Sequence, residues 1–134
     1  TRGKIFMDGR EICIEEPEQS IANGLGFLSE DRKADGFIWS MDIRENMTLV
    51  NLRNLTKGIF IDEKRELQTA KDYFKKLQVK APGLDTLITS LSGGNQQKVI
   101  LAKWLMCNIR VLMLDEPTRG IDVGTKYEIY KIMQ

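Results

Sequence analysis

The sequence predicts a protein of the mixed α/β class. Three observations support this class: an Asp-Gly pair between two β-prone runs near the start, helical periodicity through the middle third, and a continuous apolar run from Val111 to Leu114. A short continuous apolar run before charged residues is typical of a buried parallel strand. We therefore expect antiparallel strands, a helical middle part and a parallel strand.

The composition excludes several kinds of site. The 134 residues include 20 Lys and Arg, 19 Asp and Glu, and no histidine. Without histidine, Ser/His/Asp and Cys/His nucleophilic sites and HExxH zinc helices are excluded. The net charge of +1 argues against a broad nucleic-acid-binding surface, so no nucleic-acid partner is expected. The apolar runs are far shorter than the ~20 residues that cross a bilayer, so we expect any membrane role to act through a partner.

The first elements are predicted to be short. Asp8-Gly9 separates the β-prone residues 5–7 from residues 11–15, and Asp-Gly favours the tight turn of a β-hairpin because both positions of that turn need positive φ. A short helix is expected from Pro17, because proline suits the first helical turn. Leu25–Leu28 is then expected to be a brief buried strand.

Two helices are predicted in the middle third. Asp42 and Glu45 have the spacing of a capping box, so a helix is expected to begin there. A second helix is expected from about Asp62, where apolar residues recur at helical spacing, until Ala81-Pro82-Gly83 ends it.

The last third contains two patterns that suit an anion and a metal ion. Ser92-Gly93-Gly94 precedes an apolar helical segment, and it offers a cap oxygen, unobstructed backbone NH groups and the positive end of the helix dipole. Alone, this pattern is more often an ordinary helix cap. Asp115 and Glu116 follow the apolar run, at the strand end where open α/β sheets bind ligands. Their alternative is a solvated acidic turn, but the ordered combination of both patterns favours a site. An amphipathic helix is expected to follow.

These patterns together resemble the ATPase domains of ABC transporters. Residues 91–98, LSGGNQQK, resemble the ABC signature motif, residues 111–118 resemble a Walker B motif with its catalytic glutamate, and residues 119–124 resemble the D-loop that follows it. The form LSGGNQQK together with TRGIDVG is similar to the ATP-binding subunits of bacterial monosaccharide importers of the ribose/galactose/xylose group. Residues 29–33, SEDRK, resemble the second of the two ATPase halves in those subunits.

The resemblance implies a fold and a division of the chain. The fold would be that of an ABC-type P-loop NTPase, represented by part of one domain, and the strand 111–114 would lack most of its sheet neighbours here. Exposed edges then make dimerisation or strand exchange a reasonable expectation. The implied parts are a β piece (1–29), a Q-loop-like segment with the helical subdomain that docks on the permease (30–91), and the signature helix, Walker B strand, D-loop and start of the next helix (92–134).

The resemblance also implies a role for each matching residue. Glu116 would be the catalytic residue that polarises the attacking water, and Asp115 would support Mg²⁺ through water. Glu30 stands about where the family's Q-loop glutamine usually lies, which makes it a further candidate at the metal site. Asp122 would couple the two sites of the dimer. The residues expected to contact ATP held mainly by the opposite half are Ser92, Gly93, Gly94, Asn95 and Asp122.

The implied function is ATP hydrolysis, with ATP and Mg²⁺, that powers monosaccharide import at the cytoplasmic face of the cell membrane. The implied partners are the permease subunits, the other ATPase half and, indirectly, an extracellular or periplasmic sugar-binding protein. No GxxxxGK[ST] phosphate loop occurs in the sequence, so the isolated chain is expected to be inactive. The family's phosphate loop and switch histidine are expected upstream and downstream of these residues. Two alternatives stay open: a non-catalytic half that docks on the permease, and a soluble ABC ATPase of DNA repair or translation.

Overall fold

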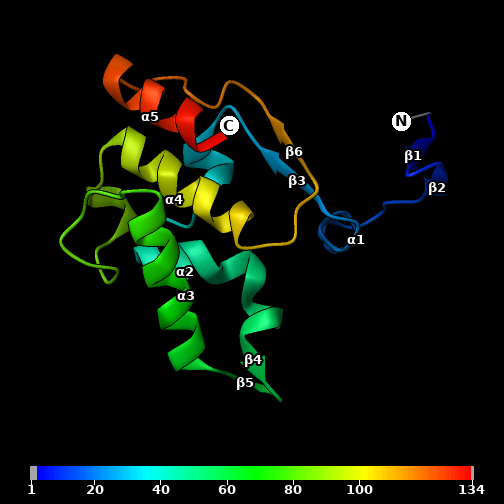
Figure 1. Ribbon diagram of the computed structural model, residues 1–134, viewed down its shortest axis with the longest axis horizontal. Coiled ribbons are helices and arrows are strands. Elements are labelled where there is room, and N and C mark those ends of the chain that lie inside the picture. Colours follow the sequence, from blue (N-terminus) through cyan, green and yellow to red (C-terminus); the bar gives the residue numbers. More distant parts are fainter. Residues whose placement is uncertain (1–2, 134) are drawn as a thin grey trace.

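The computed structural model describes residues 3–133 (Figure 1). Its regular elements follow one another in the order β1 (Ile5–Met7), β2 (Arg10–Ile12), α1 (Pro17–Ala22), β3 (Leu25–Leu28), the π-helical turn η1 (Arg32–Gly36), α2 (Ile43–Thr48), the 3₁₀ helix η2 (Leu49–Leu55), β4 (Thr56–Lys57), β5 (Phe60–Ile61), α3 (Glu63–Lys76), the 3₁₀ turn η3 (Ile88–Ser90), α4 (Gly93–Leu105), β6 (Val111–Leu114) and α5 (Val123–Met133).

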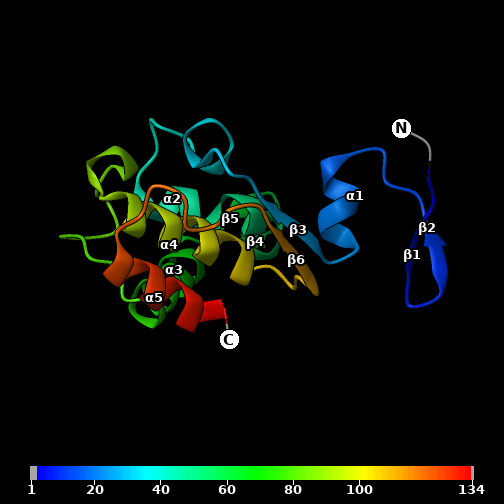
Figure 2. The ribbon, with the colours of Figure 1, turned by 90° about the horizontal axis from the view of Figure 1, so that it is seen from above.

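The β1–β2 hairpin lies at one end of the molecule (Figure 2). Asp8 and Gly9 have φ values of 51° and 76°, as the predicted tight turn requires, so that prediction is confirmed. The second strand is shorter than expected and ends at Ile12, because Ile5 is its last partner on β1. Arg110 donates two hydrogen bonds to the Asp8 carboxylate, at 2.6 and 2.9 Å, and these tie the hairpin to the body.

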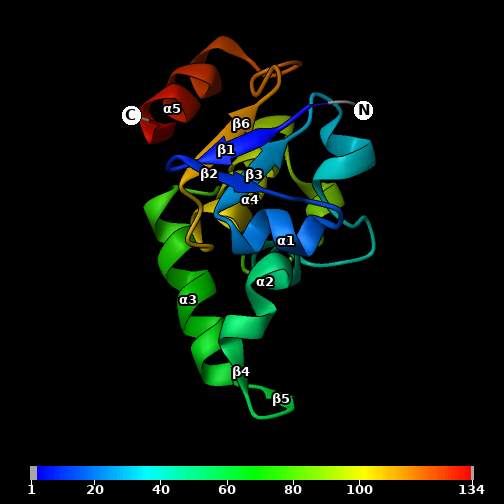
Figure 3. The same cartoon turned by 90° about the vertical axis from the view of Figure 1, so that its right-hand side faces the viewer.

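A parallel pair of strands, β3 and β6, joins residues far apart in the sequence (Figure 3). On one face, Leu28 is buried in the core, with Leu112 and Trp104 of α4 packed against that core. The opposite face carries Phe27, Val111 and Met113, each about half exposed. The interpretation of residues 111–114 as a buried strand is therefore wrong for this chain, because α4 packs on one face of the pair and the described residues leave Val111 and Met113 exposed on the other.

The helical part packs around α4 at the opposite end from the hairpin (Figure 1). The predicted capping box of α2 is confirmed: Asp42 Oδ1 accepts a hydrogen bond from the Glu45 amide at 2.8 Å, and Glu45 Oε2 accepts one from the Asp42 amide at 2.9 Å. The core between α2, α3 and α4 is formed by apolar side chains with almost no exposed surface, among them Ile43, Met47, Ala70, Val99 and Leu101.

Two local features of the helical part differ from expectation. Helix α3 ends at Lys76 rather than at residues 81–83, because Gln78 adopts a φ of 51° and the chain turns back, with the Val79 amide donating to the Phe74 carbonyl. The small β4–β5 hairpin at the far tip was not predicted; its turn contains Gly58 at a φ of 68°. No helix in the described part of the chain is both long and apolar enough to cross a bilayer.

Candidate functional site

The turn segment, residues 115–122, begins at the carboxyl end of β6, where sequence reasoning places the acidic residues. The Asp115 amide donates to the Leu28 carbonyl at 2.9 Å, so the pairing with β3 continues one residue beyond the strand. Glu116 has a φ of 41°, and its carbonyl accepts from the Arg119 amide at 3.0 Å. A left-handed conformation is uncommon for a glutamate and needs support from its surroundings. Both carboxylates are exposed at the strand end.

Asp122 ends the turn segment and begins α5. Its Oδ1 accepts a hydrogen bond from the Thr125 amide at 3.0 Å, and its carbonyl accepts from the Lys126 amide. The hydrogen bonds from the backbone and side chain of Thr125 lower the pKa of Asp122 below its ordinary value. Asp122 therefore carries a full negative charge at neutral pH.

The start of α4 contains the signature residues. The Ser92 hydroxyl accepts no hydrogen bond from the backbone amides of α4, so the expectation that it caps the helix is wrong. It accepts a hydrogen bond from the Asn95 side chain instead, at 3.0 Å. Asn95 Oδ1 in turn accepts from the Lys80 amide at 2.8 Å. Because Asn95 holds both Ser92 and Lys80, the start of α4 is fixed to the loop after α3.

The two signature glycines are closely packed, and at Gly94 the packing leaves no room for a side chain. A Cβ on Gly94 would overlap the Thr125 side chain of α5. A Cβ on Gly93 would lie 2.5 Å from Arg32 Nη2 and 3.6 Å from the Gly120 carbonyl oxygen. The structure thus brings the start of α4 against both the turn segment and the start of α5.

Glu30 is turned toward the turn segment. Its carboxylate forms an ion pair with the Arg119 guanidinium, whose Nε also lies 3.9 Å from Glu116 Oε2. Arg32 Nη1 donates to the Arg119 carbonyl at 2.8 Å. Sequence reasoning did not single out Arg32 or Arg119, because no local pattern signals a contact between residues 87 positions apart.

These residues fit a magnesium ion only together with further oxygen ligands. Mg²⁺ is usually held by one or two carboxylates plus waters and substrate phosphates, and Asp115 with Glu116 can supply that carboxylate share. Glu30 faces a guanidinium instead. Among the residues of the described range, no group of three or more His, Cys, Asp or Glu side chains could hold a metal ion by itself.

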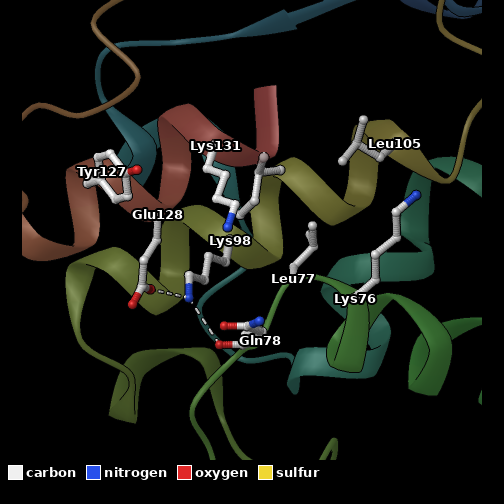
Figure 4. A pocket seen from close by; sticks show the side chains of 9 residues that line it. Lys76, Leu77, Gln78, Lys98, Leu105, Tyr127, Glu128 and Lys131 are labelled. Atoms are coloured by element: carbon white, nitrogen blue, oxygen red, sulfur yellow. Dashed lines mark hydrogen bonds and ion pairs between the residues drawn. The ribbon is translucent and has the colours of Figure 1, made fainter. Parts of the chain in front are cut away.

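A buried lysine of α4 is paired with a glutamate of α5 (Figure 4). The Lys98 side chain is 2% exposed, and its Nζ donates to Glu128 Oε2 at 2.7 Å and to the Gln78 carbonyl at 3.0 Å. These groups line a cavity of about 470 Å³. The hydrogen bond from Lys98 and its charge lower the pKa of Glu128. Lys98 thereby holds α5, and with it the end of the turn segment, against α4.

Comparison with known proteins agrees with this arrangement. The sequence profile of the family described as ABC transporter matches residues 1–119. The chain is 48% identical over 132 residues to the xylose import ATP-binding protein XylG of Geobacillus kaustophilus. It is also 48% identical over 131 residues to the ribose import ATP-binding protein RbsA of Halalkalibacterium halodurans. Each match covers 98% of this chain and 26% of the relative, so the chain spans about a quarter of their length.

The fold has solved counterparts. The ATP-binding cassette MJ0796, in a dimeric post-hydrolysis structure described as bound to ADP and Pi, matches 99% of this chain and 56% of its own with a TM-score of 0.76 and 24% identity. A second dimeric structure of this bacterial ABC transporter cassette matches equally well. The expected α/β fold of a partial P-loop NTPase domain and the expected likeness to sugar importers are both confirmed. The chain belongs to the ABC transporter family.

Proposed function

We propose that this chain is part of an ATP-binding subunit that hydrolyses ATP to energise monosaccharide import through a membrane permease. The observation that carries the proposal is the contact of the signature start with the turn segment: Gly93 lies against Gly120, a few residues after Asp115 and Glu116. The relatives named for xylose and ribose import support monosaccharides as the substrate class. The subunit would lie on the cytoplasmic face of the membrane, with a second ATPase half as its partner.

Five of the candidate residues have a chemical task in this proposal. Glu116 accepts a hydrogen bond from the attacking water and polarises it. Asp115 would hold Mg²⁺ through water, and the bound ion would supply charge neutralisation at the phosphates. The backbone NH groups at Ser92, Gly93 and Gly94 approach the γ-phosphate of ATP on the opposite half, helped by the dipole of α4. Each composite site would be complete only when two halves meet.

The proposal is tested by transport. The full-length protein, purified with its permease and sugar-binding protein, is placed in proteoliposomes, and uptake of radiolabelled D-xylose and D-ribose is measured with MgATP inside. We expect uptake that stops when ATP is replaced by a non-hydrolysable analogue. ATP hydrolysis without uptake of any sugar from a panel of pentoses and hexoses would contradict the transport assignment, and it would favour a soluble ABC ATPase.

The isolated 134-residue chain is expected to bind MgATP weakly and not to hydrolyse it. The sequence has no phosphate loop of the form GxxxxGK[ST], whose backbone NH groups and lysine hold the phosphates. Isothermal titration of the chain with MgATP is expected to give a dissociation constant of about 1 mM or weaker, a binding free energy near −4 kcal/mol. The full-length protein serves as the positive control. A micromolar constant for the isolated chain would overturn this expectation.

One observation favours the alternative of a non-catalytic half. Glu30, which stands near the usual place of a Q-loop glutamine, is engaged by Arg119. A half with this arrangement could dock on the permease while turnover occurs only in the other site. Substitution of Glu116 distinguishes the two possibilities.

A further inference from the structure

Arg32 lies where three segments of the chain meet. Its Nη1 donates to the Arg119 carbonyl in the turn segment at 2.8 Å. Its Nη2 lies against Gly93, so close that a Cβ there would be 2.5 Å away. A Cβ added to Gly120 would lie 3.8 Å from both terminal nitrogens. One guanidinium therefore contacts the first residue of α4 and two neighbouring residues of the turn segment.

The backbone that carries Arg32 is held firmly. Asp31 Oδ1 accepts hydrogen bonds from the amides of Lys33 and Ala34, at 3.0 and 3.1 Å, and so caps the π-helical turn η1. At its other end, the Gly36 carbonyl accepts from the buried Lys103 Nζ of α4 at 2.6 Å. Because η1 is fixed at both ends, the guanidinium of Arg32 has a defined position against Gly93 and Arg119.

The guanidinium is only partly satisfied. Arg32 Nε is buried, and it has no hydrogen-bond partner in the part of the chain that the structure describes. A buried donor without a partner costs free energy and calls for a reason. The planar fork of arginine, with donors in fixed directions, suits simultaneous contact with a carbonyl and a helix start better than the single ammonium of lysine. We infer that Arg32 Nε lacks a partner among the described residues because the guanidinium is oriented with both terminal nitrogens between Gly93 and the turn segment.

We propose that Arg32 is a positioning residue for ATP hydrolysis, which fixes the start of α4 relative to the turn segment that carries Glu116. The inference rests on the proposed function, in which the turn segment carries Glu116 at this half's own site and the start of α4 meets ATP held by the opposite half, so that Arg32 joins the parts that this chain contributes to the two sites. Arg32 acts through the Arg119 backbone and through Gly93. A displacement of about 1 Å between reacting groups can lower a rate by about a hundredfold, so loss of the guanidinium affects turnover more than nucleotide binding.

The variants separate this contact from its neighbours. Arg32→Ala removes the guanidinium, and Arg32→Lys keeps the charge but loses the fork. Arg119→Met removes the ion pair with Glu30 and leaves the carbonyl that accepts from Arg32. Lys33→Ala is the matched control, because Lys33 is an exposed neighbour on η1.

Two measurements on the full-length protein test the proposal. In steady-state ATPase assays, we expect Arg32→Ala to lower kcat by about tenfold to a hundredfold, with the KM for MgATP within about twofold of wild type. The kcat of Arg32→Lys is expected to lie between those of Arg32→Ala and wild type. Arg119→Met and Lys33→Ala are expected to lower kcat less than Arg32→Ala does. In hydrogen exchange by mass spectrometry, peptides that contain residues 93–94 and 119–121 exchange faster in Arg32→Ala and not in Lys33→Ala.

The outcomes distinguish failure of this inference from failure of the proposed function. A wild-type kcat in Arg32→Ala overturns the inference, as does an equal loss in Lys33→Ala. If the wild-type protein hydrolyses no ATP, the proposed function fails, and the hydrogen-exchange comparison still tests whether Arg32 positions the two segments. If Arg32→Ala does not fold, Arg32→Lys decides: a kcat equal to wild type shows that the fork is not needed, and a selective loss of kcat supports the proposal.

Discussion

Replacing Glu116 with glutamine is expected to lower ATP turnover, at this half's own composite site in the full-length protein, by about 10²–10⁴-fold. Glutamine has nearly the same shape but lacks the negative charge that polarises the attacking water. Glu116 is exposed at the end of β6, and its backbone contact uses the carbonyl, so the substitution leaves the fold intact. The measurement is release of inorganic phosphate by the purified protein with its permease, alongside a titration of nucleotide binding, which should persist.

Glu63→Gln is the matched control for this experiment. Glu63 is also an exposed glutamate, at the start of α3 and away from the turn segment, and its substitution should leave turnover unchanged. If Glu116→Gln also turns over ATP at the wild-type rate while permease binding persists, this half is a non-catalytic partner. The result therefore decides between the proposed function and its docking alternative.

The sequence predicted features that depend on neighbouring residues. The Asp8-Gly9 turn and the Asp42–Glu45 capping box each involve residues at most three positions apart, and both are present. Their physical causes, positive φ in the turn and a reciprocal side-chain cap, depend only on the types and spacing of these residues. The parallel strand 111–114 was also found, because its apolar run is continuous.

The features that sequence reasoning missed depend on tertiary contacts. The exposure of Val111 and Met113 reflects the lack of a covering element on that face of β6 among the described residues, which an apolar run does not encode. The Ser92 hydroxyl was expected to cap α4, but the Asn95 side chain competes for it. The contact of Arg32 with the Arg119 carbonyl requires the chain to return after 87 residues. Signature motifs thus located the candidate residues, whereas the contacts that hold them together appeared only in three dimensions.

Replacing Lys98 with methionine is expected to destabilise the chain by about 3 kcal/mol, at the lower end of the cost of breaking a buried ion pair. Methionine preserves most of the apolar stem but leaves Glu128 and the Gln78 carbonyl without the buried ammonium. Glu128 is 38% exposed and can turn toward water, which limits the loss. Urea unfolding followed by circular dichroism gives the change in the free energy of unfolding.

Lys80→Met is the matched control, because Lys80 Nζ lies 3.9 Å from the same Glu128 carboxylate but its side chain is 75% exposed. An exposed pair contributes little, so we expect a change within about 0.5 kcal/mol. A loss of unfolding free energy of similar size in both variants would show that the stabilisation by the Lys98–Glu128 ion pair does not depend on the burial of Lys98. Adding Glu128→Gln to Lys98→Met should recover part of the loss, because the unpaired carboxylate is then removed.

The acid dependence of stability gives an independent measure of the same pair. Lys98 lowers the pKa of Glu128 in the folded chain, so the folded state binds this proton less readily than the unfolded state. The stabilisation is complete above the unfolded value of about 4.3 and is lost as the pH falls through the lower folded pKa. The difference in unfolding free energy between wild type and Lys98→Met should therefore shrink over that acidic range and stay constant from pH 6 to pH 8. A pH-independent difference would mean that the methionine variant is destabilised by altered packing around α4 and α5 rather than by loss of the charge that joins them.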